Sequence, residues 1–194
     1  MLRIILAEAE LELVPGTERG DAQVLDSYLH RELLNALPDG RRRGRPDIVH
    51  QTLSLCQGSR LNRTGRLRAY VHTRDDIVIE VGPSTRVPPN QIEFLALMGR
   101  LLEGHEVEGY EVRSLTLRSL TEELAVPVVA MSPDGQDVRL SDVMRGHDDL
   151  AVVVGAFPCG DYCGPVYELA DIAVSLGPDL LTVPAVVSEV LCAS

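Results

Sequence analysis

The sequence has no lysine, so all 18 of its basic side chains are arginines. It also has no long hydrophobic run. The two longest, at residues 150–157 and 180–187, are far shorter than the roughly 20 apolar residues that cross a bilayer as a helix. Glu8 and Glu10 interrupt the N-terminal stretch where a secretion signal would be apolar. We therefore expect a cytoplasmic protein with no membrane contact.

Cysteines are few and scattered, which argues against a zinc site. Only Cys159 and Cys163 lie close together, and no second pair or histidine cluster completes a metal-binding pattern. None of the histidines pairs with a serine or cysteine in a nucleophile motif. The glycine pattern of dinucleotide-binding folds and the Walker phosphate loop are also absent. A Rossmann-like metabolic enzyme or an NTPase is therefore disfavoured, and we expect reduced thiols and no metal.

The remaining pattern predicts one α/β domain across residues 1–194. Its hydrophobic fraction of 45% supports a folded core. Short apolar strands alternate with helices, which is typical of a parallel sheet covered on both faces. Strands are expected at residues 1–7, 67–73, 77–81, 127–131, 150–154 and 171–175, and helices at 24–37, 46–58, 91–102, 119–125, 141–145 and 183–192. In the second helix, Ile48, Leu53 and Leu55 are expected to face the core.

The net charge is −11, yet positive charge is concentrated in one segment. Residues 41–86 hold ten arginines and four acids, a charge of +6, whereas the rest holds eight arginines and 25 acids, a charge of −17. A charged patch acts over about a Debye length, roughly 8–10 Å, so distant acids do not cancel it. This segment is therefore predicted to bind a polyanion such as a nucleic acid, despite the acidic total.

The densest part of the segment is residues 41–45, which contain four arginines immediately before a helix that starts at Pro46. The planar fork of arginine binds two phosphate oxygens at once. Asp47, in the first helical turn, has two explanations: it stabilises the helix dipole, or it orients a base and accepts a proton. Arg45 is unfavourable at a helix start, so it requires a salt bridge or a phosphate.

Three predicted strands in the second half run directly into loops at residues 131–135, 155–160 and 176–179, which contain Gly, Pro or Ser. Ligands of parallel sheets bind beyond the carboxyl ends of the strands, and glycine lets a ligand approach the backbone. The loops are either plain turns, including one at 132–135, or a site that holds a nucleotide-like cofactor through backbone groups.

Several of these motifs together resemble a known family. Residues 45–53 read Arg-Pro-Asp-Ile-Val-His-Gln-Thr-Leu, and they are followed by a strand pair at 71–76, a loop at 83–88 and a glycine loop at 155–160. This order is similar to that of the archaeal and eukaryotic ribosome-biogenesis methyltransferases of the SPOUT class. These enzymes methylate N1 of a pseudouridine in small-subunit rRNA. The resemblance covers nearly the whole chain.

The resemblance implies a parallel-sheet α/β fold with family-specific insertions and a C-terminal trefoil knot. It further implies a homodimer with small-subunit rRNA and other ribosome-assembly factors as partners. The cofactor would be S-adenosylmethionine, bound by Met131, Ser132, Gly155, Gly160, Leu176, Gly177, Pro178, Asp179, Leu180 and Leu181. Arg45 and Asp47 would be catalytic and, with Arg86, would face the RNA and the target base. Arg41, Arg42 and Arg43 would add RNA contacts.

The sequence departs from the family in one place. Members carry two further arginines three and seven residues after the one matching Arg86, where this chain has Pro89 and Glu93. Each lost arginine removes a phosphate contact, and Glu93 adds repulsion. The arginines at 41–43, 60, 63, 66 and 68 are candidates for compensation. A second function therefore stays open, that of an rRNA-binding assembly factor in which methyl transfer is secondary or lost.

Overall fold

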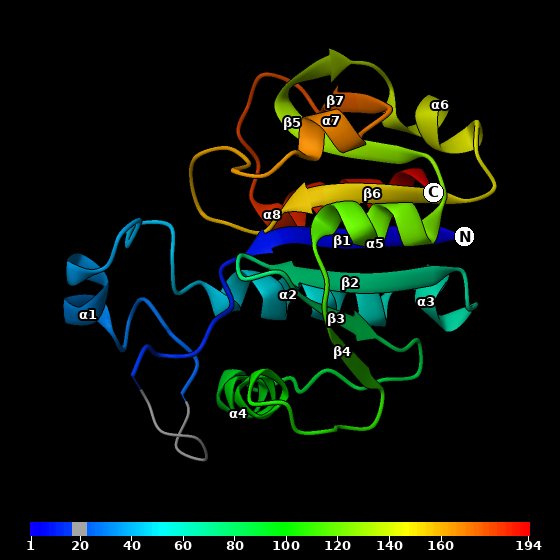
Figure 1. Ribbon diagram of the computed structural model, residues 1–194. Coiled ribbons are helices and arrows are strands. Elements are labelled where there is room, and N and C mark those ends of the chain that lie inside the picture. Colours follow the sequence, from blue (N-terminus) through cyan, green and yellow to red (C-terminus); the bar gives the residue numbers. More distant parts are fainter. Residues whose placement is uncertain (17–22) are drawn as a thin grey trace.

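A mixed sheet is the centre of the computed structural model, which describes residues 1–16 and 23–194 (Figure 1). Within these residues, seven strands are ordered β4-β3-β2-β1-β6-β5-β7. Their bounds are β1 Leu2–Ala9, β2 Leu67–Thr73, β3 Ile77–Val81, β4 Tyr110–Ser114, β5 Val128–Asp137, β6 Leu150–Gly155 and β7 Ile172–Ser175. Strands β2, β1, β6, β5 and β7 pair in parallel, whereas β3 and β4 pair antiparallel at one side. The predicted parallel sheet thus accounts for five of these strands.

Eight helices surround the sheet in the described part of the chain. They are α1 Arg31–Ala36, α2 Pro46–Gly58, α3 Arg60–Arg63, α4 Gln91–Leu102, α5 Leu117–Leu124, α6 Leu140–Arg145, α7 Val166–Leu169 and α8 Val183–Ala193. None of these helices is long and apolar enough to cross a membrane. Strands β2 and β3 and helix α4 have the bounds that the sequence predicted, because their apolar periodicity is uninterrupted.

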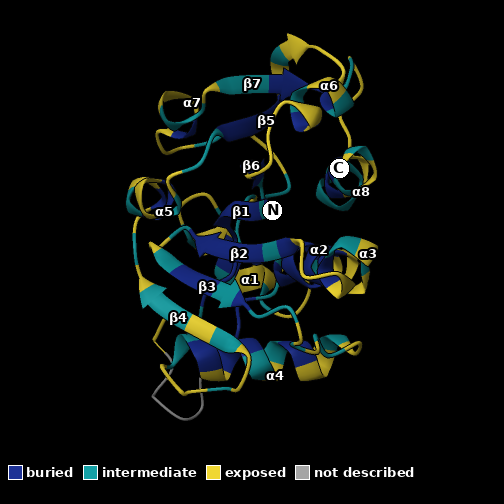
Figure 2. Ribbon diagram, turned by 90° about the vertical axis from the view of Figure 1, so that its right-hand side faces the viewer, coloured by how far each residue is buried: buried dark blue, intermediate teal, exposed yellow. Residues whose placement is uncertain are grey.

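The core lies on both faces of β1, the central strand. Ile4 and Leu6 belong to one buried cluster, while Ile5 and Ala7 belong to another, because alternate residues of a strand point to opposite faces. Buried residues of α2, α4 and α8 join the first cluster, and those of α5 and α7 join the second. Figure 2 shows α5 and α7 on one side of the sheet and α2 and α8 on the other.

Two sequence expectations about helices were wrong, and three short elements were not predicted. The helix expected at residues 24–37 is reduced to α1, because Leu25 N–H bonds to Glu12 O at 2.8 Å and Asp26 accepts the N–H groups of Tyr28 and Leu29 in a turn. Leu55 is 40% exposed and not part of the core. Strand β4, whose residues are half-buried or exposed, and the one-turn helices α3 and α7 were not predicted from the sequence.

The turn expected at residues 132–135 lies inside β5. The register with β7 shifts between Met131 and Gln136, so the chain bulges and then continues the strand. Gly135 permits this, because a Cβ atom there would lie 2.6 Å from the carbonyl carbon of Val174. The bulge therefore depends on a residue without a side chain, and it shapes the edge of the sheet where the parallel strands end.

The start of α2 is held beside this edge by hydrogen bonds from the extension of β1. Arg45 N–H donates to Glu10 O at 3.1 Å, and Glu10 N–H donates to Ala156 O at 3.3 Å. Helix α2 also packs against α8. Segments that are more than 100 residues apart in the sequence thereby meet at the carboxyl ends of β1 and β6, at the left of the sheet in Figure 1.

Candidate cofactor and substrate site

A cavity of about 470 Å³ lies at this edge of the sheet. Among the predicted cofactor residues, its lining includes Met131, Ser132, Gly155, Gly160, Leu176, Gly177, Asp179, Leu180 and Leu181. Arg45 and Asp47, which the sequence placed at the target base, line the same cavity. Pro178, Arg41, Arg42, Arg43 and Arg86 do not. The three loops and the start of α2 therefore form one site.

Arg45 and Asp47 form a two-pronged ion pair at the start of α2. Arg45 Nε donates to Asp47 Oδ1 and Nη2 donates to Asp47 Oδ2, both at 2.8 Å. The side chains are about one-third exposed. The hydrogen bond to Asp47 raises the pKa of Arg45 above its ordinary value. Of the two partners expected for Arg45, a salt bridge or a phosphate, the salt bridge is present, and it fixes the direction of the carboxylate in the cavity wall.

The loop after β6 approaches the cavity closely because two glycines shape it. A Cβ atom at Gly155 would lie 2.6 Å from the Phe157 ring, so only glycine fits there without displacing that ring. Gly160 has a φ of +85°, a conformation that side chains other than glycine rarely adopt. Phe157 packs edge-on against Tyr162, with ring centroids 5.5 Å apart. These contacts give the loop a defined shape.

Two residues of this loop that the sequence analysis did not select also line the cavity. Tyr162 donates from its hydroxyl to Met131 O at 2.9 Å, and burial raises its pKa, so it remains a donor. Asp161 accepts the Tyr167 hydroxyl at 2.6 Å and the Tyr162 N–H at 2.8 Å. The Tyr167 hydroxyl also lies 2.9 Å from Ser132 Oγ. Their position directly after Gly160 was the available sequence signal.

The loop after β7 forms the opposite wall. Ser175 Oγ accepts the N–H of Gly177 at 3.2 Å and donates to its carbonyl at 3.1 Å. Gly177 has a φ of +118°, which again favours glycine. Leu180 is 81% exposed and Leu181 is 39% exposed beside the cavity. Large apolar side chains that remain exposed at a cavity are available to pack against a ligand.

Arg42 and Arg43, which the sequence suggested as RNA contacts, turn inward instead of facing solvent. Arg42 donates from Nη2 to Glu8 and from Nε to Glu10, at 2.5 and 2.7 Å. Arg43 bonds Glu12 with two nitrogens, and both arginine side chains are only 13% exposed. Their positive charges are therefore neutralised inside the protein, which removes them from the candidate RNA contacts.

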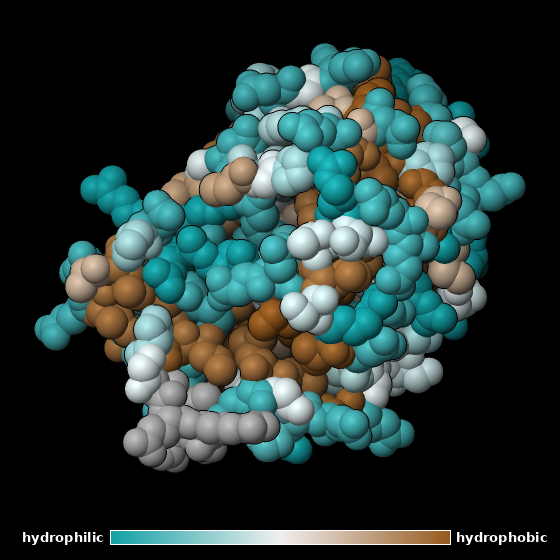
Figure 3. Space-filling model, in the orientation of Figure 1, coloured by the Kyte–Doolittle hydropathy of each residue, from teal (hydrophilic) through white to brown (hydrophobic). Residues whose placement is uncertain are grey.

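Arg41 and Arg86, in contrast, are exposed. The loop that carries Arg86 is pinned against α2 and α4. His50 Nε2 lies 2.6 Å from Pro88 O, and the His50 ring stacks on Phe94 with centroids 4.4 Å apart. Pro89 and Glu93, which stand where the family has arginines, are exposed as well. The polar face in Figure 3 is interrupted by apolar side chains that gather over α1. Leu29, two residues before α1, is 64% exposed.

Comparison with known proteins identifies the family. The family model described as EMG1/NEP1 methyltransferase matches residues 4–194. The chain belongs to this family. The resemblance that its motifs predicted is thereby confirmed, as is its identification as a methyltransferase. One relative, the ribosomal RNA small subunit methyltransferase Nep1 of Thermococcus kodakarensis, is 40% identical and aligns with 98% of this chain and 96% of its own.

Further EMG1/NEP1 proteins match over similar lengths. The Nep1 of Methanothrix thermoacetophila is 37% identical, covering 98% of this chain and 94% of its own. The crystal structure of Archaeoglobus fulgidus Nep1 bound to S-adenosylhomocysteine superposes with a TM-score of 0.87 at 30% identity, covering 99% of this chain and 96% of that one. The predicted SPOUT-type α/β fold is confirmed by this match. The C-terminal knot stays a prediction from family membership.

Proposed function

We propose that this protein transfers the methyl group of S-adenosylmethionine to N1 of a pseudouridine in small-subunit rRNA. The observation that carries the proposal is the shared cavity. It is lined by the three loops predicted to hold the cofactor and by the Arg45–Asp47 pair predicted to face the base. A methyl donor and its acceptor must meet in one place, since proximity and orientation supply much of the rate.

The cavity has the properties that a cofactor of this class requires. Its volume of about 470 Å³ lies within the usual range of small-molecule sites, about 300–1,000 Å³. Gly155, Gly160 and Gly177 expose backbone groups in its walls. Asp161 contributes a carboxylate to the lining, which suits a cofactor that carries positive charge at its sulfonium and amino groups. When bound, S-adenosylmethionine supplies an electrophilic methyl group.

The side chains at the start of α2 perform the remaining steps. The target base is turned out of its stack to enter the cavity, as enzymes that act on a base require. Asp47 accepts a hydrogen bond from the N1–H of the base and receives that proton as the new bond forms. Arg45 holds the Asp47 carboxylate in a fixed direction through its two hydrogen bonds. The third guanidinium nitrogen of Arg45, Nη1, is not used in this pair and remains available to an RNA phosphate.

RNA beyond the target base is expected to follow the exposed side of α2. The Arg86 loop is tied to the far end of this helix and to α3, because Gln57 donates to Gly82 O at 3.0 Å and Asn62 donates to Pro83 O at 2.9 Å. Arginines that are exposed along this route are suited to phosphates. They are Arg41, Arg60, Arg63, Arg66 and Arg86.

The proposal extends to the molecular context of the reaction. The family implies a homodimer that acts in the cytoplasm during ribosome assembly, together with other assembly factors. The apolar side chains over α1 support a contact with a protein partner, because exposed apolar patches of this kind mark interaction surfaces. All four cysteines are free thiols, which fits a reducing compartment.

Methyl transfer to defined RNAs tests the proposal. Labelled S-adenosylmethionine is incubated with a stem-loop that contains one pseudouridine, with the same stem-loop containing uridine, and with one containing N1-methylpseudouridine. Only the first RNA is expected to gain label, because the other two have no free N1–H. Equal label in the uridine and pseudouridine RNAs would exclude the substrate assignment. Failure of the protein to bind S-adenosylhomocysteine in calorimetry would exclude the cofactor.

A further inference from the structure

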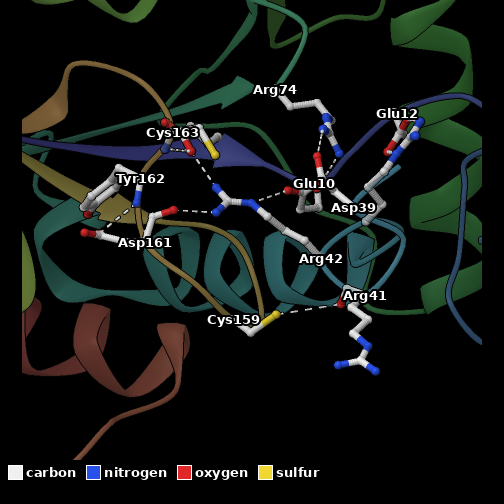
Figure 4. A network of polar contacts seen from close by, with 12 residues as sticks. Glu10, Glu12, Asp39, Arg41, Arg42, Arg74, Cys159, Asp161, Tyr162 and Cys163 are labelled. Atoms are coloured by element: carbon white, nitrogen blue, oxygen red, sulfur yellow. Dashed lines mark hydrogen bonds and ion pairs between the residues drawn. The ribbon is translucent and has the colours of Figure 1, made fainter. Parts of the chain in front are cut away.

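Arg42 is at the centre of a buried polar network that joins two walls of the cavity. Figure 4 shows its guanidinium between Glu10 and the loop that carries Asp161 and Cys163. Besides its bonds to Glu8 and Glu10, it donates from Nη1 to the carbonyl of Asp161 at 2.5 Å. Its guanidinium carbon also lies 3.7 Å from the centre of the Phe157 ring. One side chain therefore contacts the loop at residues 157–164 at two points.

Glu8 completes the connection from the other side. Its carboxylate accepts the backbone N–H of Cys163 at 2.9 Å and that of Gly164 at 2.6 Å. A Cβ atom at Gly164 would lie 3.1 Å from Glu8 Oε1, so the loop backbone approaches this carboxylate closely. The loop is thus held at its beginning by Arg42 and at its end by Glu8, and these two residues are paired with each other.

The backbone of Glu8 is strained in a way that favours this contact. Glu8 has a φ of +51°, which is uncommon for a residue with a side chain, and the register of β1 with β2 shifts between Leu6 and Ala9. Such strain persists only where surrounding contacts fix it, and it occurs often at functional sites. The bulge interrupts the regular alternation of side chains along β1, and the Glu8 carboxylate points toward the backbone amides of Cys163 and Gly164.

We propose that Arg42 and Glu8 are positioning residues that hold the loop at 157–164 in the shape that binds the cofactor. The proposal rests on the cofactor class assigned above. Phe157, Gly160 and Asp161, which line the cavity, lie between the two anchored ends of the loop. Because Arg42 precedes Arg45 by three residues, the same contacts also fix the start of α2 relative to this loop. The distance between these two walls of the cavity, the loop at 157–164 and the start of α2, is thereby fixed.

The first test compares two variants of adjacent arginines. Arg42→Met keeps an unbranched apolar stem against Phe157 but removes the guanidinium fork. Arg43→Met is the matched control, because Arg43 is equally buried and pairs with Glu12 but does not contact the loop. We expect Arg42→Met to weaken S-adenosylhomocysteine binding at least tenfold in calorimetry. Arg43→Met should change this affinity less than twofold. Both variants should lower the melting temperature by similar amounts.

A second measurement separates the clamp from the cofactor assignment. Amide hydrogen exchange of Cys163 and Gly164 is followed by NMR in the protein without added ligand. Both amides should be protected in the parent protein and in Arg43→Met, and should exchange at least tenfold faster in Arg42→Met. Glu8→Gln weakens the acceptor without removing the side chain, so it should also speed the exchange of both amides. This variant replaces Arg42→Met in the test if Arg42→Met does not fold.

The outcomes discriminate between the two proposals. Equal losses of affinity in Arg42→Met and Arg43→Met, or unchanged exchange at both amides, would show that Arg42 only stabilises the fold. Arg42→Lys should give an intermediate result, because a single ammonium cannot contact Glu8, Glu10 and Asp161 in the planar arrangement of the fork. A parent protein that protects both amides but does not bind S-adenosylhomocysteine would support the clamp and exclude the proposed cofactor.

Discussion

Arg45 and Asp47 face each other across a single turn at the start of α2, joined by two parallel hydrogen bonds of 2.8 Å. The pair sits in the wall of the cavity, where the proposed reaction requires a proton acceptor with a fixed direction. A two-pronged pair of this kind adds geometric specificity as well as energy. It therefore offers a direct means of testing whether the cavity performs chemistry or only binds RNA.

Asp47→Asn should lower the rate of methyl transfer by about 10²–10⁴-fold, the usual contribution of a positioned acid or base. The amide preserves the shape of the side chain but cannot accept the N1 proton. Binding of S-adenosylhomocysteine should change much less, since the cofactor loops are intact. Single-turnover rates and calorimetry on the same preparation provide both values. A normal rate in Asp47→Asn would contradict the role of Asp47 as proton acceptor, whereas a lost rate with retained RNA binding and unaffected cell growth would favour the alternative role of an rRNA-binding assembly factor.

Gly155→Ala should weaken S-adenosylhomocysteine binding by about tenfold. The added methyl group would lie 2.6 Å from the Phe157 ring, which is held by the Arg42 guanidinium on one side and cannot yield without breaking that contact. Gly58→Ala is the matched control, since no atom lies within 4 Å of the added Cβ. It should leave affinity unchanged and increase stability by about 0.4–1 kcal/mol. Equal affinity in the two variants would contradict the assigned cofactor loop.

Thiol labelling of the native protein should modify three cysteines. Cys159, Cys163 and Cys192 are exposed, whereas Cys56 is buried. Burial raises the pKa of Cys56 to about 12, and the reactive species is the thiolate, so this thiol should be inert at pH 8. Mass spectrometry after alkylation should show three adducts in buffer and four in guanidinium chloride. A fourth adduct in buffer would mean that α2 opens readily from the core.

Glu93→Arg should strengthen RNA binding and steepen its dependence on salt. Glu93 is exposed in the first turn of α4, and a new phosphate contact there should change the slope of log K against log salt by about 0.7–0.9. The cost is a loss of about 0.3–1 kcal/mol of favourable helix-dipole interaction. Filter binding over a range of salt concentrations measures the slope.

The control for this charge reversal is Glu122→Arg. Glu122 is exposed on α5, which packs on the opposite face of the sheet from α2 and α4. The net charge of the two variants is identical, so a purely global effect would change both equally. RNA affinity that rises equally in both, or in neither, would contradict the proposed path along α2.

The parts of the fold that could be predicted from sequence are those with local causes. Helix α4 and strands β2 and β3 follow apolar periodicity, and Pro46 marks the start of α2. The family motifs supplied the cofactor loops and the Arg45–Asp47 pair, which periodicity alone left open. Strand β4 was missed because an edge strand with half-buried residues has no apolar pattern to detect.

The environment of the arginines could not be predicted because their partners are distant in the sequence. Arg42 and Arg43 look like surface residues in a basic run, yet they bond glutamates 34 and 31 residues earlier. Glu8 lies in the bulge at the end of β1, and Glu12 lies three residues beyond the strand. No local pattern indicates which of several arginines will turn inward, since that choice depends on how β1 and the segment before α2 meet in three dimensions.

On the proposed RNA path, the length of α2 determines how much RNA reaches from the cavity to the arginines of α3. The helix begins at the cavity with Pro46 and ends at Gly58, next to the exposed arginines of α3. Its 13 residues, at 1.5 Å each, extend about 20 Å. A stacked strand rises about 3.4 Å per nucleotide, so it covers this distance in about six nucleotides. An RNA with fewer nucleotides between the target base and its end along α2 would occupy the cavity but not reach the arginines of α3. The length of the helix would therefore discriminate between RNAs of different length.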